Sequence, residues 1–339
     1  MGYRIVNVVG NAGANRPVAE FLAAFVRDGE LALPRPGDDD ARVWEQRMRW
    51  WWDENPHCRD DSPRGFVLED ESGAVVGFNG FIPFDYEVNG EPVPTFVTTS
   101  FFVREGHRSA VMGMLTRQRS LGKTHQIIDG SPSPEMRRLL EKLGYVSSGG
   151  RRQYLFPTSC LGGGAARAVL RRVGWSFALP VAEGFSVTGD PAAFADVTTP
   201  HDGRIHRRLS ANSLSWLCRV GSARRQFFGL LDCEGNPLAY AIGLFKEKAG
   251  VKACLLMDYQ DLHPDGVGLS LLLRKLLDDP AGSGLDLDTG LLLFSRFESD
   301  PASTSGGIRR DSILHYHLPP ACKDREKACR PFEGDLPLL

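Results

Sequence analysis

The sequence predicts a mixed α/β (α+β) chain of two tandem domains, each with a mixed, largely antiparallel sheet flanked by helices. Three observations predict this class. The length of 339 residues suits two domains. Stretches with the alternation typical of strands take turns with stretches of helical periodicity. A hairpin pattern at residues 66–78 returns without gaps at residues 228–240, each copy around an acidic–glycine turn, which indicates a repeat; a chance match of one hairpin is the alternative.

The first half is expected to contain these elements in order. A strand at residues 3–9 precedes a helix at 16–28. Asp38, Asp39 and Asp40 predict the start of a second helix, because acidic side chains favour the positive end of the helix dipole, and Asn55-Pro56 ends it. The hairpin at 65–78, a turn at Asn89-Gly90 and a strand at 95–103 follow. Residues 107–121 are expected to form a helix, 126–129 a strand, 134–143 a helix and 145–156 a last strand.

Bulky side chains recur along one face of the second helix. They stand at i, i+4, i+7 and i+8, at Trp44, Met48, Trp51 and Trp52. This spacing predicts a packed aromatic face. A surface that stacks on a substrate is the alternative.

The domain boundaries are expected at residues 1–157, 158–180 and 181–339, with the middle segment a linker and helix. Gly162-Gly163-Gly164 indicates the boundary. The helix after it, at residues 165–173, carries Arg167, Arg171 and Arg172. Such a cluster is more often a solvated face than an anion site, and both interpretations stay open.

Composition disfavours several classes. The formal net charge of -2 provides no overall field toward nucleic acid or an anionic membrane. Seven cysteines without a C-x-x-C pair disfavour a disulfide framework or a structural zinc, and predict reduced thiols in the cytoplasm. No signal peptide is expected at the N-terminus. No membrane span is expected, since the most apolar stretch, residues 267–277, contains Arg274 and Lys275.

Three stretches of the first half resemble the GNAT superfamily of acyl-CoA-dependent N-acyltransferases. They are Trp50-Trp51-Trp52-x-x-Asn55-Pro56 with the hairpin that follows, residues 101–108, and residues 134–145, which end in Leu143-Gly144-Tyr145. The resemblance covers roughly residues 1–156, and the second half matches less closely. It implies two tandem GNAT-like domains and an acyl-CoA cosubstrate, acetyl-CoA or a longer one.

The family's cofactor loop is Arg/Gln-x-x-Gly-x-Gly/Ala. The matching residues are Arg108, Ser109, Ala110, Val111, Met112 and Gly113, with Val111 in place of a glycine. The resemblance implies that backbone N–H groups at this helix start bind the CoA pyrophosphate, as helix N-termini bind anions in general. An ordinary amphipathic helix start is the alternative.

The resemblance also implies a strand amide that polarises the thioester carbonyl, at Phe102 or Val103. The equivalent loop of the second half, Asp265-Gly266-Val267-Gly268, has an acidic residue and no arginine. Its charge would repel a pyrophosphate. We therefore expect the second domain to bind no cofactor.

Transfer of an acyl group to an amine requires a base. Asp129, at the end of a short strand, and Glu105 and His107, beside the loop, are the candidates; a turn or cap acceptor and a solvated surface are the alternatives. The family's late-helix tyrosine, which serves the leaving thiolate, matches Leu140, so that role is empty or filled elsewhere.

Two further groups are candidates for other roles. Asp258 and Tyr259, with Asp261 and His263, are candidates for orienting a substrate, with a polar loop as the alternative. His315-x-His317 has no evident third ligand, so no metal site is expected.

The expected function is transfer of an acetyl or longer acyl group from CoA to an amine of a small molecule, such as a sugar or amino-acid precursor. Transfer from an acyl-carrier protein, aminoacyl transfer by a related ligase, and a non-catalytic CoA-binding or metabolite-binding protein are the alternatives. Nucleic acid is not an expected partner, and the oligomeric state stays open.

Overall fold

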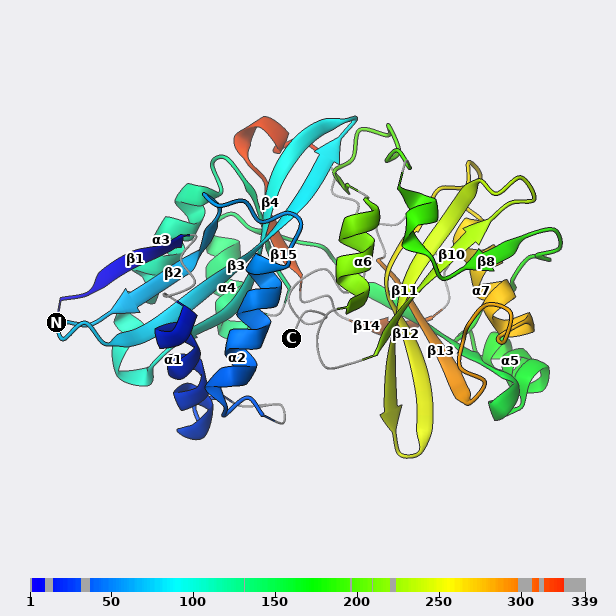
Figure 1. Cartoon of the computed structure of the whole chain (residues 1–339), viewed down its shortest axis with the longest axis horizontal. Helices are drawn as coiled ribbons and strands as arrows, with labels where there is room; N and C mark the ends of the chain where they lie inside the picture. Colours follow the sequence, from blue (N-terminus) through cyan, green and yellow to red (C-terminus); the bar gives the residue numbers. More distant parts are fainter. Residues whose placement is uncertain are drawn as a thin grey trace.

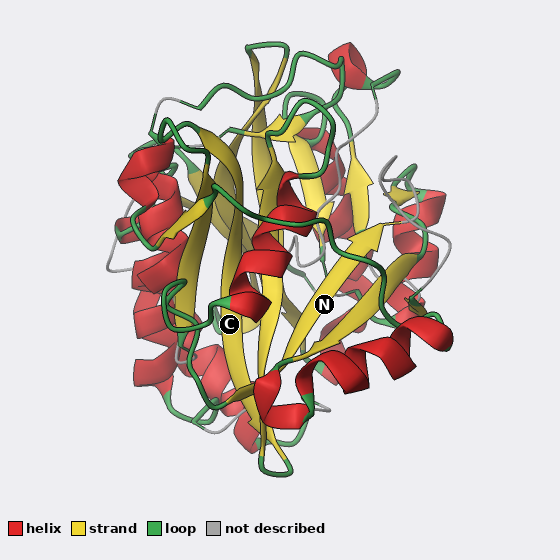
Figure 2. Ribbon diagram, turned by 90° about the vertical axis from the view of Figure 1, so that its right-hand side faces the viewer, coloured by secondary structure: helices red, strands yellow, loops and turns green. Residues whose placement is uncertain are grey.

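The structure is a computed structural model that describes residues 2–9, 15–31, 37–130, 132–195, 197–208, 210–219, 224–297, 307–310 and 314–325. Two mixed sheets flanked by helices make up the fold, which confirms the predicted class. The sheets lie side by side, the first beside the N-terminus (Figure 1). Helices lie on both sides of the strands (Figure 2).

The first sheet has the order β1-β2-β3-β4-β5-β15-β6, with β9 on β3. Its strands are β1 (Arg4–Val9), β2 (Pro63–Glu69), β3 (Val75–Val88), β4 (Glu91–Val103), β5 (Gln126–Asp129), β6 (Val146–Ser147), β9 (His206–Arg207) and β15 (His315–His317). One face packs on α1 (Asn15–Arg27), α2 (Ala41–Met48) and the π-helical turn η2 (Arg49–Asp53). The other packs on α3 (Val111–Leu121) and α4 (Pro134–Lys142).

The second sheet has the order β14-β7-β13-β12-β11-β10-β8. Its strands are β7 (Arg151–Pro157), β8 (Ser186–Thr188), β10 (Arg225–Leu231), β11 (Pro237–Lys248), β12 (Val251–Asp261), β13 (Thr289–Phe297) and β14 (Ile308–Arg310). The helices of this half are α5 (Gly163–Arg172), α6 (Ala211–Arg219) and α7 (Gly268–Asp278), with the short turns η4 (Ser159–Leu161), η5 (Pro191–Phe194) and η6 (Pro320–Cys322).

The hairpins β2–β3 and β10–β11 share one turn geometry. Asp70 and Asp232 each accept hydrogen bonds from the backbone N–H groups two and four residues further on. Gly73 and Gly235 follow with φ of 83° and 87°, which glycine adopts without strain. The repeat seen in the sequence is therefore a structural repeat rather than a chance match.

The prediction of a single strand at residues 145–156 is wrong. Two strands stand there, and β6 joins the first sheet while β7 lies between β14 and β13 in the second. The first sheet is completed by β15, near the end of the described chain, which lies between β5 and β6 (orange-red in Figure 1). Gly149, with φ of 79°, interrupts the stretch. Beyond it, Tyr154 and Phe156 are buried in the second core.

The tryptophan-rich helix is a core element, as its spacing predicts. Its four side chains are at most 2% exposed: Trp44, Met48, Trp51 and Trp52. The neighbouring Trp50 packs against Trp216 of α6 with ring centroids 5.5 Å apart. Trp216 Nε1 also donates to the Trp50 carbonyl at 3.1 Å. The face is therefore packed in the core, and Trp50 beside it joins the first half of the chain to α6.

Helix ends follow the predicted signals, with one exception. Asp40 caps α2 by accepting from the Arg42 N–H, and Pro134 occupies the first turn of α4. The helix predicted from residue 107 begins at Val111, because Glu105–Ala110 form the 3-10 turn η3. Within the described residues, no helix is both long and apolar enough to cross a membrane.

Candidate functional site

The first sheet opens into a fork between β4 and β5. These strands are parallel neighbours from Thr95, opposite Gln126, to Thr98, opposite Asp129. Beyond Thr98, β4 continues to Val103, and in the described part of the chain no strand pairs with it on the β5 side. Crevices at the carboxyl ends of parallel strands are frequent ligand sites. The open edge of β4 therefore presents backbone groups to a ligand.

A β-bulge lies at the fork. Phe78 is opposite Phe102, whereas Gly80 is opposite Thr99. Two residues of β4, Ser100 and Phe101, thus face one residue of β3. Ser100 has φ of 52°, a left-handed conformation that costs free energy for a residue other than glycine. Bulges bend strands and often lie beside active sites, and this one lies where β4 leaves β5.

The hydrogen-bond ladder identifies which β4 amide faces the fork. The Arg104 N–H donates to the Val76 carbonyl at 3.0 Å. Hydrogen-bonded and non-hydrogen-bonded pairs alternate along an antiparallel ladder. Val103, one residue earlier, therefore directs its N–H away from β3 and toward the open side. Of the two predicted positions, this geometry favours Val103 over Phe102, whose ring packs against Phe25 of α1 at 5.0 Å.

The predicted cofactor loop joins η3 to α3. Its six residues, 108–113, are exposed or half-buried. The residues at the two N-cap positions, Arg104 before η3 and Ala110 before α3, provide no capping hydrogen bond from their own side chains. Some amides are engaged within the turn, since the Val111 N–H bonds to the Arg108 carbonyl. The loop is accessible to an anion, and an anion bound there would replace some of these internal bonds.

Carboxylates lie close to the start of η3. Glu30 accepts from the Glu105 N–H at 3.1 Å. Arg104 Nη1 pairs with Glu30 and with Asp28, both at 2.8 Å. A carboxylate at a helix start competes with a phosphate for the same N–H groups. The carboxyl of Glu105, a predicted base, belongs to an exposed residue on this surface turn.

A buried chain of hydrogen bonds starts beside the bulge. Asn79 Nδ2 donates to Gln118 Oε1 at 2.6 Å, and Gln118 Nε2 donates to Tyr145 Oη at 2.7 Å. Asn79 Oδ1 is buried without a partner. Burial raises the pKa of Tyr145, the Gln118 hydrogen bond opposes the rise, and the charge of Asp129 adds to it. The Tyr145 phenol therefore stays protonated, and its O–H can donate a hydrogen bond to another acceptor.

A row of three polar side chains crosses the sheet where the fork begins. Thr98 and His315 are the register partners of Asp129 on its two neighbouring strands. Directly opposed residues project to one face of a sheet. All three are buried, and His315 Nε2 lies 3.3 Å from Glu141 Oε1 of α4. Asp129 thus stands beside the fork on the α4 side.

Sequence reasoning missed four residues of this region: Asn79, Gln118, Tyr145 and His315. His315 was considered only for a metal, and the described residues contain no group of three or more side chains that could hold one. Tyr145 was noted only as the end of a motif. The long-range pairing of β15, which brings His315 beside Asp129, leaves no signal in the sequence.

The two residues predicted to orient a substrate do not converge. Neighbouring residues on a strand point to opposite faces. Asp258 pairs with Arg207 and accepts from Tyr240 Oη at 3.2 Å. Tyr259 Oη donates to the Ser295 carbonyl at 2.9 Å. Both side chains have partners inside the second half of the chain.

The second sheet has a fork and a bulge of its own. β12 and β13 are parallel neighbours from Lys252 to Leu255. Beyond Leu255, β12 stays paired with β11 up to Asp261, but no strand in the described part of the chain pairs with it on the β13 side. The register shift on this strand falls at Met257. The loop before α7, however, is filled by the carboxylate of Asp261.

Asp261 caps the amino end of α7. Its carboxylate accepts from the N–H groups of His263, Gly268 and Leu269, each at 3.1 Å. A Cβ on Gly268 would lie 2.6 Å from Asp261 Oδ1, so this close approach requires glycine. The sequence placed the repelling charge at Asp265, but that side chain is 83% exposed. Asp261 is the acidic residue at the helix start.

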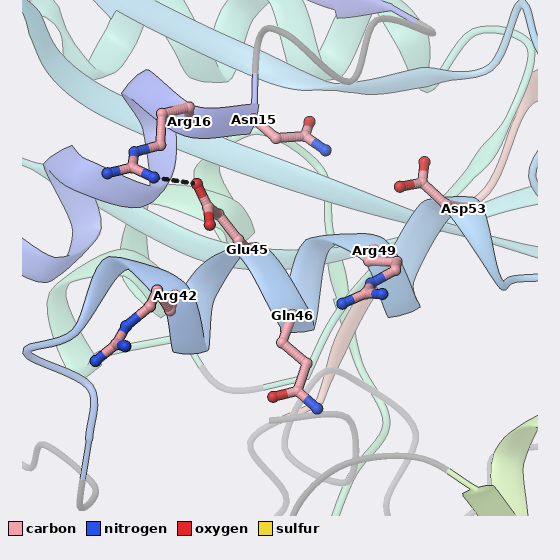
Figure 3. Close-up of a pocket in the computed structure, with 7 residues that line it drawn as sticks. All are labelled: Asn15, Arg16, Arg42, Glu45, Gln46, Arg49 and Asp53. Atoms are coloured by element: carbon pink, nitrogen blue, oxygen red, sulfur yellow. Dashed lines mark ion pairs between the residues drawn. The ribbon is translucent and has the colours of Figure 1, made fainter.

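A cavity of about 520 Å³ opens beside α1 and α2. It is lined by Asn15, Arg16, Arg42, Glu45, Gln46, Arg49 and Asp53 (Figure 3). Asn15 is 8% exposed, and its Oδ1 has no hydrogen-bond partner among the described residues. Asp53 pairs with Arg64 at 2.8 Å, next to Gly65. The register from Gly65 through Gly80 to Thr99 puts the cavity level with the bulge along the strands.

No protein-family model and no curated protein sequence matches the chain. Three solved structures resemble it over most of its length. A probable N-acyltransferase from Enterococcus faecalis has a TM-score of 0.57 at 10% identity, over 93% of this chain and 72% of that one. A GCN5-related N-acetyltransferase from Anabaena variabilis has a TM-score of 0.54 at 13% identity, over 94% and 74%. Eis1 from Mycobacterium abscessus has a TM-score of 0.54 at 14% identity, over 94% and 73%.

Sequence identities this low indicate a shared fold and do not indicate a shared activity. The chain therefore has the fold of the GNAT superfamily, the GCN5-related N-acetyltransferases.

Proposed function

We propose that the chain is an N-acyltransferase that takes an acetyl or longer acyl group from CoA and transfers it to an amine. The observation that carries the proposal is the fork between β4 and β5, with its bulge and the adjoining α3, whose start is capped by no side chain within the described residues. When bound, acyl-CoA supplies an acyl group already activated as a thioester.

The residues of the first fork fit such a cosubstrate. The exposed Arg108 forms no ion pair within the described part of the chain and is suited to a phosphate. The backbone at Ser109–Gly113 is accessible from solvent. Val103 directs its N–H into the fork, where it is suited to polarise a thioester carbonyl. Val111 allows less close approach than the glycine of the family pattern, which lowers the affinity we expect.

Two buried side chains are proposed for the proton transfers. Asp129 accepts the proton that the amine loses as its nitrogen bonds to the acyl carbon. Tyr145 donates a hydrogen bond to the sulfur as the carbon–sulfur bond breaks, and does not itself ionise because its pKa is raised. The proton held by Asp129 then passes to the sulfur. Tyr145 thus fills the role left empty by Leu140.

The cavity beside α1 and α2 is proposed for the acceptor. Glu45 and Asp53 favour a cationic amine, although they already pair with Arg16 and Arg64. Arg49 is exposed and, within the described residues, forms no ion pair. It is therefore suited to an anionic group on the same acceptor. An amine that also carries an anionic group, such as an amino-acid precursor, matches this pair of charges.

We also assign the chain to the cytoplasm. The six cysteines within the described residues are all free thiols, which supports a reducing compartment.

Thermal unfolding with acetyl-CoA, longer acyl-CoA and free CoA tests the proposal. A ligand at 100 times its Kd stabilises the folded chain by about 2.7 kcal/mol. Arg108→Glu is expected to reduce this shift strongly, because it puts a carboxylate beside the pyrophosphate. Arg117→Glu changes the charge equally on an exposed residue of α3 beyond the loop and is the matched control.

The outcomes separate the candidates. A shift that Arg108→Glu removes and Arg117→Glu preserves supports the CoA site. A shift that survives Arg108→Glu removes that residue from the site. No shift with any CoA species overturns the acyl-CoA proposal and favours transfer from a carrier protein or a non-catalytic protein.

A further inference from the structure

The segment that joins the two halves differs in charge from the rest of the chain. The whole chain has 40 Lys+Arg and 42 Asp+Glu. Residues 142–182, however, contain no acidic residue at all and six cationic ones: Lys142, Arg151, Arg152, Arg167, Arg171 and Arg172. A net charge near zero therefore conceals a stretch without carboxylates, in which α5 carries three of the six cations, Arg167, Arg171 and Arg172.

The outer face of α5 is apolar. None of its residues is buried. Val169 and Val173, four residues apart and hence on one side of the helix, are 59% and 56% exposed, and Trp175 is 45% exposed. Leu161 and Val181 nearby are exposed as well. A helix that merely faces water has no need of these side chains. Exposed apolar residues among cations are typical of a helix that lies in a membrane interface.

The inner face of α5 lines an anion-sized cavity of about 160 Å³. Arg167 and Arg171 line it together with Arg274 of α7 and Ser176. Arg274 pairs with Asp278, whereas the described residues offer no ion pair to Arg167 or Arg171. Phe156, Phe177, Leu179 and Leu277 form an apolar floor.

Ser176 supplies an independent sign of a ligand. The residue is 6% exposed, and its Oγ has no hydrogen-bond partner among the described residues. An unpaired buried hydroxyl costs free energy that a hydrogen bond recovers. A phosphate oxygen in the cavity would accept that bond and would also pair with the two arginines, as charge-assisted contacts of this kind do.

We propose that α5 and Trp175 dock on an anionic phospholipid surface, with one lipid phosphate in the cavity of Arg167, Arg171 and Ser176. The valines and the tryptophan enter the interface, where tryptophan is favoured. The basic residues interact with the anionic headgroups. In Figure 1, α5 lies at the end of the molecule opposite to β1, so docking there leaves the first fork in water.

Vesicle binding by the full chain tests the proposal. We expect binding to vesicles of phosphatidylcholine with phosphatidylglycerol and little binding to phosphatidylcholine alone, weakening as salt rises. Trp175 is the one exposed tryptophan among six, so its emission reports the event by a blue shift. Rising inorganic phosphate without vesicles distinguishes a free phosphate from a lipid headgroup.

Three variants identify the contacts. The pair Arg167→Gln with Arg171→Gln is expected to weaken vesicle binding by roughly tenfold or more. The pair Arg117→Gln with Arg138→Gln, both exposed on α3 and α4, changes the net charge equally and should leave binding unchanged. Ser176→Ala should weaken binding without lowering the Tm, because it removes a buried hydroxyl that has no partner.

Three results would overturn membrane docking. The first is equal binding to neutral and anionic vesicles, or none to either. The second is an effect of inorganic phosphate in the absence of any vesicle binding, which would assign the cavity to a phosphorylated small molecule. The third is self-association in gel filtration that Val169→Asn abolishes, which would assign the apolar face to a second copy of the chain.

Discussion

The helix starts at the two forks of the molecule differ in what occupies them. At the second fork, Asp261 comes from the adjoining strand and accepts from three backbone N–H groups before and within α7. At the first fork, no side chain within the described residues accepts from the N–H groups at the start of α3, and Arg108 is exposed beside it. One fold thus leaves the helix start open in one half and fills it with an internal carboxylate in the other.

The difference is one of degree, because a carboxylate also reaches the first fork. Glu30 accepts from a single N–H, that of Glu105, the first residue of η3. This end of η3 is the one away from α3. Glu30 comes from the loop after α1 and not from the strand of the fork. A bound phosphate can therefore compete with Glu30 over a single hydrogen bond, whereas Asp261 would have to give up three. We propose that the second half serves as a structural partner.

The largest effect should come from Asp261→Ala, which opens the filled helix start. The loss of a charged cap with three hydrogen bonds should lower the free energy of unfolding by about 2 kcal/mol. Chemical denaturation monitored by tryptophan fluorescence measures it. Asp265→Ala, on an exposed side chain of the same loop, is the control and should cost far less. Equal costs for the two would mean that Asp261 does not hold α7.

A smaller effect is expected from Glu30→Gln at the first fork. The amide still accepts from the Glu105 N–H, while the negative charge near the proposed phosphates is gone. Acetyl-CoA should bind about three- to tenfold more tightly, as judged from the energy of one nearby charge. Isothermal titration calorimetry measures the change in Kd.

Glu20→Gln provides the reference for that experiment. Glu20 lies on α1, is exposed and pairs with Arg16, so its substitution alters net charge equally but away from the loop. If both variants tighten binding alike, the effect is one of overall charge. If Glu30→Gln weakens binding, Glu30 does not compete with the cosubstrate.

Local features of the fold were predictable because their causes are local. The turns at Asp70 and Asp232, the cap at Asp40 and the buried tryptophans all follow from a few neighbouring residues. The exchange of β7 and β15 between the sheets was not predictable, because strand periodicity does not specify a partner sheet. A three-residue strand such as β15 carries too little pattern to be placed from sequence.

The residues of the candidate site also divide into those that local sequence reveals and those that only the fold brings together. The loop at Arg108 was found through a contiguous motif. The bulge at Ser100 and the chain from Asn79 through Gln118 to Tyr145 depend on residues that only the fold brings together. Asp261 was overlooked in favour of Asp265 for a related reason. Its carboxylate reaches back across the loop to Gly268, and spacing alone does not reveal that contact.

Hydrogen–deuterium exchange with and without acetyl-CoA tests the central claim most directly, since it reports both forks in one experiment. The account predicts slower exchange of amides at residues 99–113, around the first fork and η3, with residues 256–269 of the second fork unchanged. Protection at the second fork alone, or at neither, would contradict the assignment of CoA to the first.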